Sequence, residues 1–455
     1  MDDTICAIST AINGAISIVR LSGADSISIV NSIFTEKITE ESHKIYYGHI
    51  KDEDEVIDEV LVMVMKSPRT YTTEDIVEIN CHGGITTTNK VLELLLKKGA
   101  RLAEPGEFTK RAYLNGRINL LEAESVNDLI TAKTDAARKL AINNVDGKLS
   151  KKISNLREKI AKILANIEVN IDYPEYTDEL DVTNELMHDY LTDIKKDLDS
   201  LVNGAKNGRL IKEGVNVAII GKPNVGKSSI LNSLLDEDKA IVTNIPGTTR
   251  DIVEGTITID GVAINLIDTA GIRKTDDLVE QIGVEKSEKT ADNSDIILFV
   301  LNNNEELTNE EEVMLNKYNS DKLILFINKT DLKKKLIVPD YVKDVIYGNT
   351  IELNGLDELK NKISDKLNLK NVINKDMSYL SNVREIDLVN KASDSLKSAQ
   401  DNLNAGFPVD VVEIDLKNAW DYLGEIMGMS YKDELVDKIF SNFCLGKWGL
   451  KCMML

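Results

Sequence analysis

One short segment constrains the fold of this 455-residue chain more than any other: Gly221-Lys-Pro-Asn-Val-Gly-Lys-Ser228. It matches G-x-x-x-x-G-K-[ST] and lies between a β-rich run, VNVAIIG, and a helical pattern, SSILNSLL. The glycines let the backbone turn tightly enough for its N–H groups to surround phosphates. Lys227 can neutralise phosphate charge, and the Ser228 hydroxyl is placed to bind Mg²⁺. The segment therefore predicts a phosphate-binding loop between a strand and a helix.

Three further motifs predict that the bound nucleotide is GTP. Asp268-Thr-Ala-Gly271 ends the run AINLID and puts a carboxylate near the metal ion. Thr248 and Thr249 lie in the preceding loop, where a threonine can complete the metal shell. Asn328-Lys-Thr-Asp331 ends the run LILFIN, and its carboxylate can pair with guanine but not with adenine. The four motifs together predict a domain that binds and hydrolyses GTP.

Two positions depart from the usual GTPase pattern. Gly348-Asn349-Thr350 stands where a Ser-Ala loop normally supports guanine, so base affinity could be weaker. Ile272 follows the Asp-Thr-Ala-Gly motif where a Ras-like switch carries a water-positioning Gln. Another group must then align the attacking water, or hydrolysis is slow. The acidic candidates downstream are Asp276, Asp277, Glu280 and Glu285.

The pattern of apolar residues predicts a multidomain fold that combines α/β and all-α parts. Residues 1–117 mix short strands and helices, and 118–213 form amphipathic helices with a hinge at Gly204 and Gly208. Residues 214–370 alternate strands with helices, as a Ras-like parallel sheet covered on both faces requires. Residues 371–455 are helical again. We therefore expect a helical domain that is interrupted by the GTPase domain.

Composition excludes several classes of protein. The net charge of −21 argues against a large nucleic-acid surface, because phosphate binding needs clustered Lys and Arg. The four cysteines lie far apart without a CxxC pair, which argues against a zinc site or a disulfide framework. The longest apolar runs are far below the ~20 residues that a membrane helix needs. The first residues resemble no secretory signal, so we expect a cytoplasmic protein.

At this point the chain resembles, over essentially its whole length, the MnmE (TrmE) family of tRNA-modification GTPases. The signatures flanking the nucleotide domain are the more specific ones, because the nucleotide motifs occur in many GTPases. The stretches that carry the resemblance are 17–23, 71–84, 101–130, 221–229, 241–251 and 439–447.

The resemblance implies an N-terminal domain that binds tetrahydrofolate and dimerises, followed by a helical domain interrupted by the GTPase domain. It implies a homodimer that assembles with an FAD-dependent partner, MnmG (GidA), into a heterotetramer. The complex would add an aminomethyl-type group at carbon 5 of the wobble uridine of certain tRNAs. A methylene-tetrahydrofolate would supply the carbon, and glycine or ammonium the nitrogen.

The resemblance also implies roles for residues of the GTPase domain. Asn224 and the loop that follows the first helix would bind K⁺, with Thr243, Ile245 and Thr248 as further ligands. The Mg²⁺ ligands would be Ser228 and Thr249. Glu280 would orient the attacking water, while Arg250 and Asp251 would link loop ordering to dimerisation of the GTPase domains. The residues expected at GTP are Asn224, Val225, Gly226, Lys227, Ser228, Ser229, Thr243, Asn244, Ile245, Pro246, Gly247, Thr248, Thr249, Asp268, Thr269, Ala270, Gly271, Asn328, Lys329 and Asp331.

For folate, the resemblance points to Arg20, Glu78, Arg117 and Lys447. Cations suit the glutamate carboxylates of a folate, and a buried acid can pair with the amino-pyrimidine edge of its pterin. The family ends at the Gly-Lys that corresponds to Lys447, with a cysteine, here Cys444, close to the folate. This chain continues with WGLKCMML, which can crowd that site. The segment His82-Gly-Gly84 is expected to be a structural turn.

Two other functions compete with this interpretation. A switch GTPase in ribosome assembly would have binding as its output, and the folate-type signatures argue against it. A stand-alone folate aminomethyltransferase would leave a complete GTPase domain unexplained.

Replacing the predicted water-orienting residue, Glu280→Ala, should keep GTP affinity and lower the hydrolysis rate by about a hundredfold or more, the usual range for a lost proton-transfer group. Single-turnover kinetics and nucleotide titration measure the two quantities. Unaffected turnover in Glu280→Ala would remove Glu280 from the mechanism.

Overall fold

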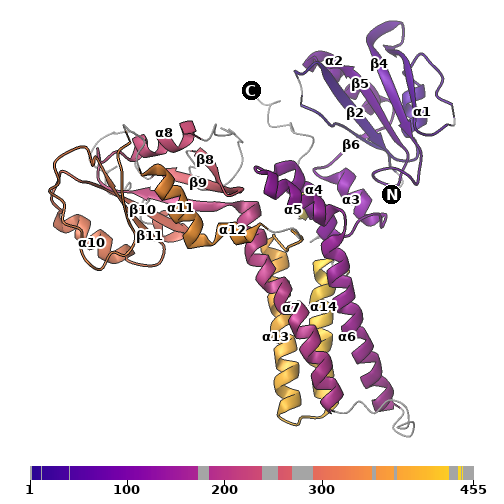
Figure 1. Cartoon of the computed structure of the whole chain (residues 1–455). Helices are drawn as coiled ribbons and strands as arrows, with labels where there is room; N and C mark the ends of the chain where they lie inside the picture. The colour runs from indigo at the N-terminus through magenta and orange to yellow at the C-terminus, as the bar shows by residue number, and fades with distance from the viewer. Residues whose placement is uncertain are drawn as a thin grey trace. The chain divides into compact units, whose positions relative to one another are not determined.

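The computed structural model describes residues 3–11, 13–39, 41–172, 184–237, 255–268, 290–350, 355–373, 377–429, 439–441 and 443 (Figure 1). The chain forms two compact units. Unit 1 comprises Met1–Asn127, Val145–Val182 and Ser395–Leu455, and unit 2 comprises Asp128–Asn144 and Thr183–Asp394.

Unit 1 contains a six-stranded sheet with the order β3-β4-β5-β2-β1-β6. Its strands are β1 (Ile5–Ile8), β2 (Ile16–Ser22), β3 (Lys44–Asp52), β4 (Glu55–Met65), β5 (Ile76–His82) and β6 (Arg101–Leu102). Along β4, buried residues alternate with exposed ones, as expected for a sheet that has one face in the core. Helices α1 (Ser26–Asn31) and α2 (Ile85–Lys97) contribute Val30, Leu94 and Leu95 to that core. The predicted α/β fold of the N-terminal region is confirmed.

A fully buried arginine holds the start of helix α3 (Glu107–Leu114) to the sheet of unit 1. Arg111 Nη2 lies 2.8 Å from Asp3 Oδ1 and 3.2 Å from Glu107 Oε1, and Arg111 Nη1 lies 3.0 Å from Glu74 Oε2. The side chain of Arg111 is 0% exposed, so its charge depends on these carboxylates for solvation. This ion cluster therefore fixes three distant parts of the chain in one place.

Helices α6 (Lys148–Asp172) and α14 (Val409–Ile426) pack against each other in unit 1. The guanidinium of Arg157 lies 4.0 Å from the centre of the Trp420 ring, a cation–π contact. A Cβ at Gly424 would lie 3.0 Å from that guanidinium, so the glycine leaves the room that the contact needs. These two helices, distant in sequence, confirm that both flanks of the nucleotide region contribute to one helical assembly.

Unit 2 contains a second six-stranded sheet, with the order β12-β11-β10-β7-β9-β8. Its strands are β7 (Val215–Ile220), β8 (Gly255–Ile259), β9 (Val262–Asp268), β10 (Ile296–Asn302), β11 (Leu323–Asn328) and β12 (Val345–Tyr347). All neighbouring strands are parallel except the edge pair β8–β9. Every residue of β10 and β11 is buried, as in a sheet covered on both faces. The predicted parallel sheet is confirmed.

The helices of unit 2 cover the two faces of this sheet. Strand β7 sends Val217 and Ile219 into one apolar cluster and Ala218 and Ile220 into another. Residues of α8 and α11 belong to the first cluster, and residues of α10 belong to the second. The bounds of these helices are α8 (Lys227–Glu237), α10 (Asn309–Tyr318), α11 (Leu356–Leu367) and the short α12 (Leu369–Val372).

The hinge predicted at Gly204 and Gly208 is wrong, because both glycines lie inside the continuous helix α7 (Asn184–Glu213). A Cβ at Gly208 would lie 2.1 Å from the carbonyl oxygen of Leu380. A Cβ at Gly204 would lie 2.7 Å from the Tyr379 ring. The glycines therefore provide a notch on α7 for the segment that precedes α13 (Val383–Asn404), and flexibility is not their purpose.

Unit 2 also contains part of the region that we expected to be purely helical-domain sequence. Helix α4 (Leu120–Thr131) begins in unit 1 and ends in unit 2, and α5 (Asp135–Val145) contributes Ala136, Ala137 and Leu140 to the apolar cluster of the second sheet. The domain boundaries at 117, 213 and 370 remain predictions. Among the described residues, no helix combines the length and apolarity that crossing a bilayer demands.

Replacing the buried cation, Arg111→Met, should lower the free energy of unfolding by ~3–5 kcal/mol, because it leaves the mostly buried Glu74 carboxylate without its cation. Urea unfolding of the full chain, followed by circular dichroism, measures the change. Lys44→Met removes an exposed cation from the pair with Glu41 and is the matched control, expected to be indistinguishable from the unmodified chain. Equal stability of all three proteins would contradict the role of the ion cluster.

Candidate nucleotide-binding site

The predicted phosphate loop follows β7, the strand of unit 2 at which the order of strand addition reverses. Strands β9 and β8 lie on one side of β7, and β10, β11 and β12 lie on the other. In open parallel sheets, ligands bind beyond the carboxyl ends of the strands at such a switch point. The fold therefore puts Gly221-Lys-Pro-Asn-Val-Gly-Lys-Ser228 where a ligand is expected.

Three positive φ angles shape this loop: +147° at Gly221, +64° at Asn224 and +100° at Gly226. A Cβ at Gly221 would lie 2.5 Å from the Val300 carbonyl oxygen. A Cβ at Gly226 would lie 2.2 Å from Asn328 Nδ2. Glycine is therefore required at both positions for two reasons: the backbone has a positive φ, and the neighbouring strands leave no room for a Cβ.

Lys227 begins helix α8, and its side chain bends back over the loop. Its Nζ donates to the carbonyl oxygens of Gly221, at 2.7 Å, and Lys222, at 2.8 Å. Lys227 is only 6% exposed, whereas Ser228 and Ser229 on the same helical turn are exposed. An ammonium beside the N-terminus of a helix attracts an anion, since both carry positive charge.

The Asn-Lys-Thr-Asp segment after β11 is joined directly to the phosphate loop. Asn328 is 1% exposed, and its Nδ2 donates to the carbonyl oxygen of Val225 at 2.9 Å. Lys329 has a φ of +60°, and its Nζ donates to the carbonyl oxygen of Asn224 at 2.9 Å. Asp331 is exposed just beyond them. The structure therefore brings together the two motifs that the sequence predicted would share one nucleotide.

The departure at Gly348-Asn349-Thr350 lies beside this segment. Thr330 Oγ1 donates to the carbonyl oxygen of Gly348 at 3.0 Å, and the N–H of Gly348 donates to the carbonyl of Ile327. Asn349 is buried immediately after the end of β12. A buried amide thus stands where the usual pattern has a small Ser-Ala pair.

One contact of the phosphate loop was not predicted from the sequence. The Nζ of Lys222 lies 2.5 Å from Thr308 Oγ1 and 3.5 Å from Glu311 Oε2. Thr308 and Glu311 form the capping box of α10, in which each side chain bonds to the other's backbone N–H. The spacing Thr-x-x-Glu could have predicted the capping box, but not its contact with Lys222.

Several predicted site residues lie outside the described residues, among them Glu280, Lys447 and Cys444. Asp268 ends β9 and pairs with Ile219 of β7, next to the phosphate loop. The other residues outside the described part are Thr243, Asn244, Ile245, Pro246, Gly247, Thr248, Thr249, Arg250, Asp251, Thr269, Ala270 and Gly271.

Of the residues proposed for folate, the structure describes Arg20, Glu78 and Arg117, all in unit 1. Arg20 and Glu78 are cross-strand partners, and Arg20 Nη2 lies 2.6 Å from Glu78 Oε1. The Arg20 guanidinium also lies 5.6 Å from the centre of the Phe108 ring. Arg117 lies over the ring of Tyr71 at 4.9 Å, and the Tyr71 hydroxyl hydrogen-bonds to the next residue of α3, Thr109. Arg20 and Glu78 thus form a paired site, and Arg117 approaches the same helix.

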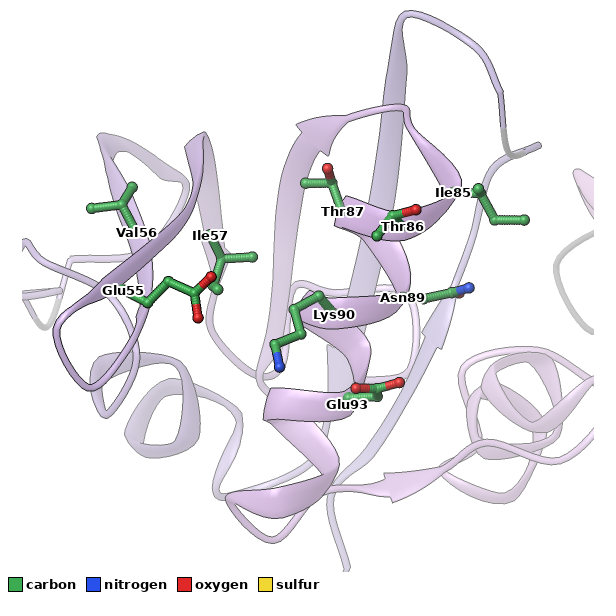
Figure 2. Close-up of a pocket in the computed structure, with 9 residues that line it drawn as sticks. All are labelled: Glu55, Val56, Ile57, Ile85, Thr86, Thr87, Asn89, Lys90 and Glu93. Atoms are coloured by element: carbon green, nitrogen blue, oxygen red, sulfur yellow. The ribbon is translucent and has the colours of Figure 1, made fainter.

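A separate hollow of about 600 Å³ lies between β4 and α2. Figure 2 shows the side chains that line it. No predicted site residue lines it. Just before α2 in the chain, His82 Nδ1 lies 2.7 Å from Asp58 Oδ1, a bond that raises the pKa of His82. A Cβ at Gly83 would lie 2.1 Å from the Gly14 carbonyl oxygen, so close packing explains this glycine. The residues that line the hollow are Glu55, Val56, Ile57, Ile85, Thr86, Thr87, Asn89, Lys90 and Glu93.

Two family models match the chain. The model described as "MnmE helical domain" matches residues 120–444, and the model described as "GTP-binding protein TrmE N-terminus" matches residues 4–117.

Curated relatives match along nearly the whole chain. A tRNA modification GTPase MnmE of Streptococcus thermophilus is 49% identical over 449 residues, which is 98% of either chain. The protein with the same description from Ligilactobacillus salivarius is 51% identical over 458 residues, again 98% of either chain. Among solved structures, the G domain of the T. maritima FeoB iron transporter is 28% identical. It covers 33% of this chain and 98% of its own, with a TM-score of 0.26, on which we base no conclusion.

Gly226→Ala should weaken GTP binding by about ten- to a hundredfold, because a non-glycine residue at such a φ costs about 1–3 kcal/mol and the new methyl group meets Asn328. Titration with a fluorescent guanine nucleotide measures the affinity. Gly84→Ala is the control, since its Cβ would have only an ordinary contact, at 3.8 Å. Unchanged affinity in Gly226→Ala would mean that the two loops are not held together as described.

Proposed function

The chain belongs to the MnmE family of tRNA modification GTPases, and we propose that it hydrolyses GTP as one subunit of a complex that modifies carbon 5 of the wobble uridine in certain tRNAs. The observation that carries this proposal is the bonding of the base-recognition segment to the phosphate loop, through Asn328 and Lys329. That bonding gives one rigid cradle for a guanine nucleotide.

Each part of the cradle has a role in the proposed GTPase reaction. The backbone N–H groups of the loop and the start of α8 bind the phosphates, and Lys227 neutralises their charge. Asp331, exposed at the edge, selects guanine because its carboxylate would be left unpaired beside adenine. Asn328 holds the two loops in register, so that base and phosphates are bound in one orientation. Glu280 would orient the attacking water.

The residues at the loop fit the two cations that we propose. Ser228 is exposed on the first turn of α8, where its hydroxyl would hold Mg²⁺ with Thr249. The backbone carbonyl of Asn224 is bonded to Lys329, while its side chain is exposed and would offer an oxygen to K⁺. Thr243, Ile245 and Thr248 would complete that shell. A cation there would stabilise the charge that develops between the β- and γ-phosphates.

For the one-carbon chemistry, we propose that unit 1 binds a tetrahydrofolate derivative through Arg20, Glu78 and Arg117. Glu78 is buried, and Arg20 neutralises its charge. The Glu78 carboxylate can bond to the polar edge of a pterin in place of Arg20. Lys447 and Cys444 would take part if the tail after Lys447 leaves the site open.

The proposed assembly follows the family. It contains a homodimer of this chain and an FAD-dependent MnmG-type protein, joined as a heterotetramer that acts on tRNA. Arg250 and Asp251 would connect ordering of the loop to pairing of the GTPase domains. We propose a cytoplasmic location, where the tRNA substrate is found.

The function is tested by nucleoside mass spectrometry of tRNA from a strain that lacks this chain. We expect the modified wobble uridine to disappear and to return when the chain is restored. Calorimetry of the purified protein with 5-formyltetrahydrofolate separates the proposal from a ribosome-assembly switch. Binding heat supports one-carbon chemistry, whereas unchanged tRNA together with no folate binding would favour the switch.

GTP hydrolysis should be about tenfold or more faster in KCl than in NaCl at equal ionic strength, because K⁺ stabilises charge in the transition state. Phosphate release measures the rates. Asn224→Ala should remove the difference between the two salts, and equal rates for the unmodified protein would exclude K⁺ as an activator.

A further inference from the structure

Four polar side chains of unit 2 line one small cavity, and we call them the polar joint: Asp128, Asn144, Lys212 and Ser381. Lys212 Nζ lies 2.7 Å from Asp128 Oδ1, and Ser381 Oγ donates to Asp128 Oδ2 at 3.3 Å. The carboxylate of Asp128 is 12% exposed. The Lys212 side chain is 25% exposed, so the pair is only partly shielded from solvent, and the mostly buried carboxylate depends on its partners.

The first turn of α13 secures the joint from one side. Lys212 Nζ donates a further hydrogen bond to Asn382 Oδ1. The buried carboxylate of Glu385 accepts from the N–H groups of Ser381, at 3.0 Å, and Asn382, at 3.1 Å. Ser381, two residues before α13, and Lys212, near the end of α7, are therefore bonded to the same carboxylate, that of Asp128.

A small cavity of about 20 Å³ lies among the four residues of the joint. Asn144 Nδ2 donates to the carbonyl oxygen of Tyr379 at 3.0 Å, but its Oδ1 is buried with no partner among the described residues. A water molecule needs about 10–15 Å³ and several polar partners, and the cavity offers both. One enclosed water that donates to Asn144 Oδ1 would complete the hydrogen bonding of the joint.

Apolar contacts fasten the same segment to the nucleotide sheet. Ala136, Ala137 and Leu140 of α5 belong to the apolar cluster that includes Val215 and Ile264 of β7 and β9. On α7, the notch at Gly208 admits the Leu380 carbonyl. Segment Asp128–Asn144 is thus held in unit 2 by apolar packing against the sheet as well as by hydrogen bonds.

The position of the joint in the chain suggests its purpose. Asp128 and Asn144 are the first and last residues of the segment by which unit 2 includes α5. Strand β7 begins three residues after Lys212 and ends at the phosphate loop. Helices α4 and α13 each run from one unit into the other. A group that holds their ends in unit 2 can pass a change at the nucleotide along both helices.

We propose that the polar joint, completed by one enclosed water molecule, couples the nucleotide bound in unit 2 to the parts of helices α4 and α13 that belong to unit 1. Asp128 and Lys212 are positioning residues in this coupling, and neither touches GTP. The proposal rests on the proposed function, since coupling is measured by tRNA modification.

The ion pair must be removed without leaving a buried charge. Burial raises the pKa of Asp128, and the Lys212 ammonium opposes that shift. Lys212→Met alone would leave the carboxyl without its cation, which risks misfolding. The double variant Asp128→Asn with Lys212→Met removes both charges and keeps the side-chain volumes similar, so it is the decisive protein.

The experiment compares the full-length double variant with Lys212→Arg and with Arg209→Gln. Arg209 forms an exposed pair with Glu213 on the same helix and is the matched control. For each protein, GTP hydrolysis is measured in vitro, and the modified wobble uridine is measured in the deletion strain. In the double variant we expect hydrolysis within about twofold and modification lowered at least about fivefold, the lower end of usual coupling between sites.

Lys212→Arg and Arg209→Gln should keep both activities. Wild-type modification in a folded double variant would overturn the proposal, as would a parallel loss of hydrolysis and modification. If the wild-type chain fails to restore the modified wobble uridine in the deletion strain, the proposed function is wrong, whatever the variants do. A high-resolution crystal structure should show a water at Asn144 Oδ1, and a dry cavity would refute that part of the joint.

Discussion

The nucleotide site depends on a sheet whose strands are buried on both faces. Because β10 and β11 have no exposed residue, their polar groups can appear only at the ends of the strands. That constraint puts Asn328 and the phosphate loop at the same edge, close enough for Asn328 to bond to Val225. The cradle is therefore a consequence of how the core is packed, and the motif residues use an edge that the sheet already provides.

Much of this arrangement could be predicted from sequence because the signals are local. A glycine-rich turn between a strand and a helix, and a polar segment directly after an apolar strand, each have a pattern that a short window contains. The parallel order of the strands followed from their alternation with helices. The capping box that receives Lys222 had a local signal too, but its link to the phosphate loop joins positions that only the fold brings together.

The wrong prediction and the omissions have two causes: glycine has two physical uses, and some contacts depend on how distant segments pack. Glycine was taken as a sign of flexibility at 204 and 208, yet there it removes a side chain so that another segment can approach. The segment Asp128–Asn144 has the same helical pattern as its neighbours, and nothing in that pattern says which core it joins. Likewise, Arg20 and Glu78 were each recognised singly, while their pairing depends on strand register.

The contact between Gly226 and Asn328 limits how this family of sites can diverge. The amide of Asn328 occupies the space that any side chain at position 226 would need, and it bonds to the residue just before that glycine. A change of base preference that enlarges or reshapes position 328 would therefore deform the phosphate cradle at the same time. Base specificity and phosphate binding are therefore coupled here, and a redesign of the base site at position 328 must also redesign the phosphate loop.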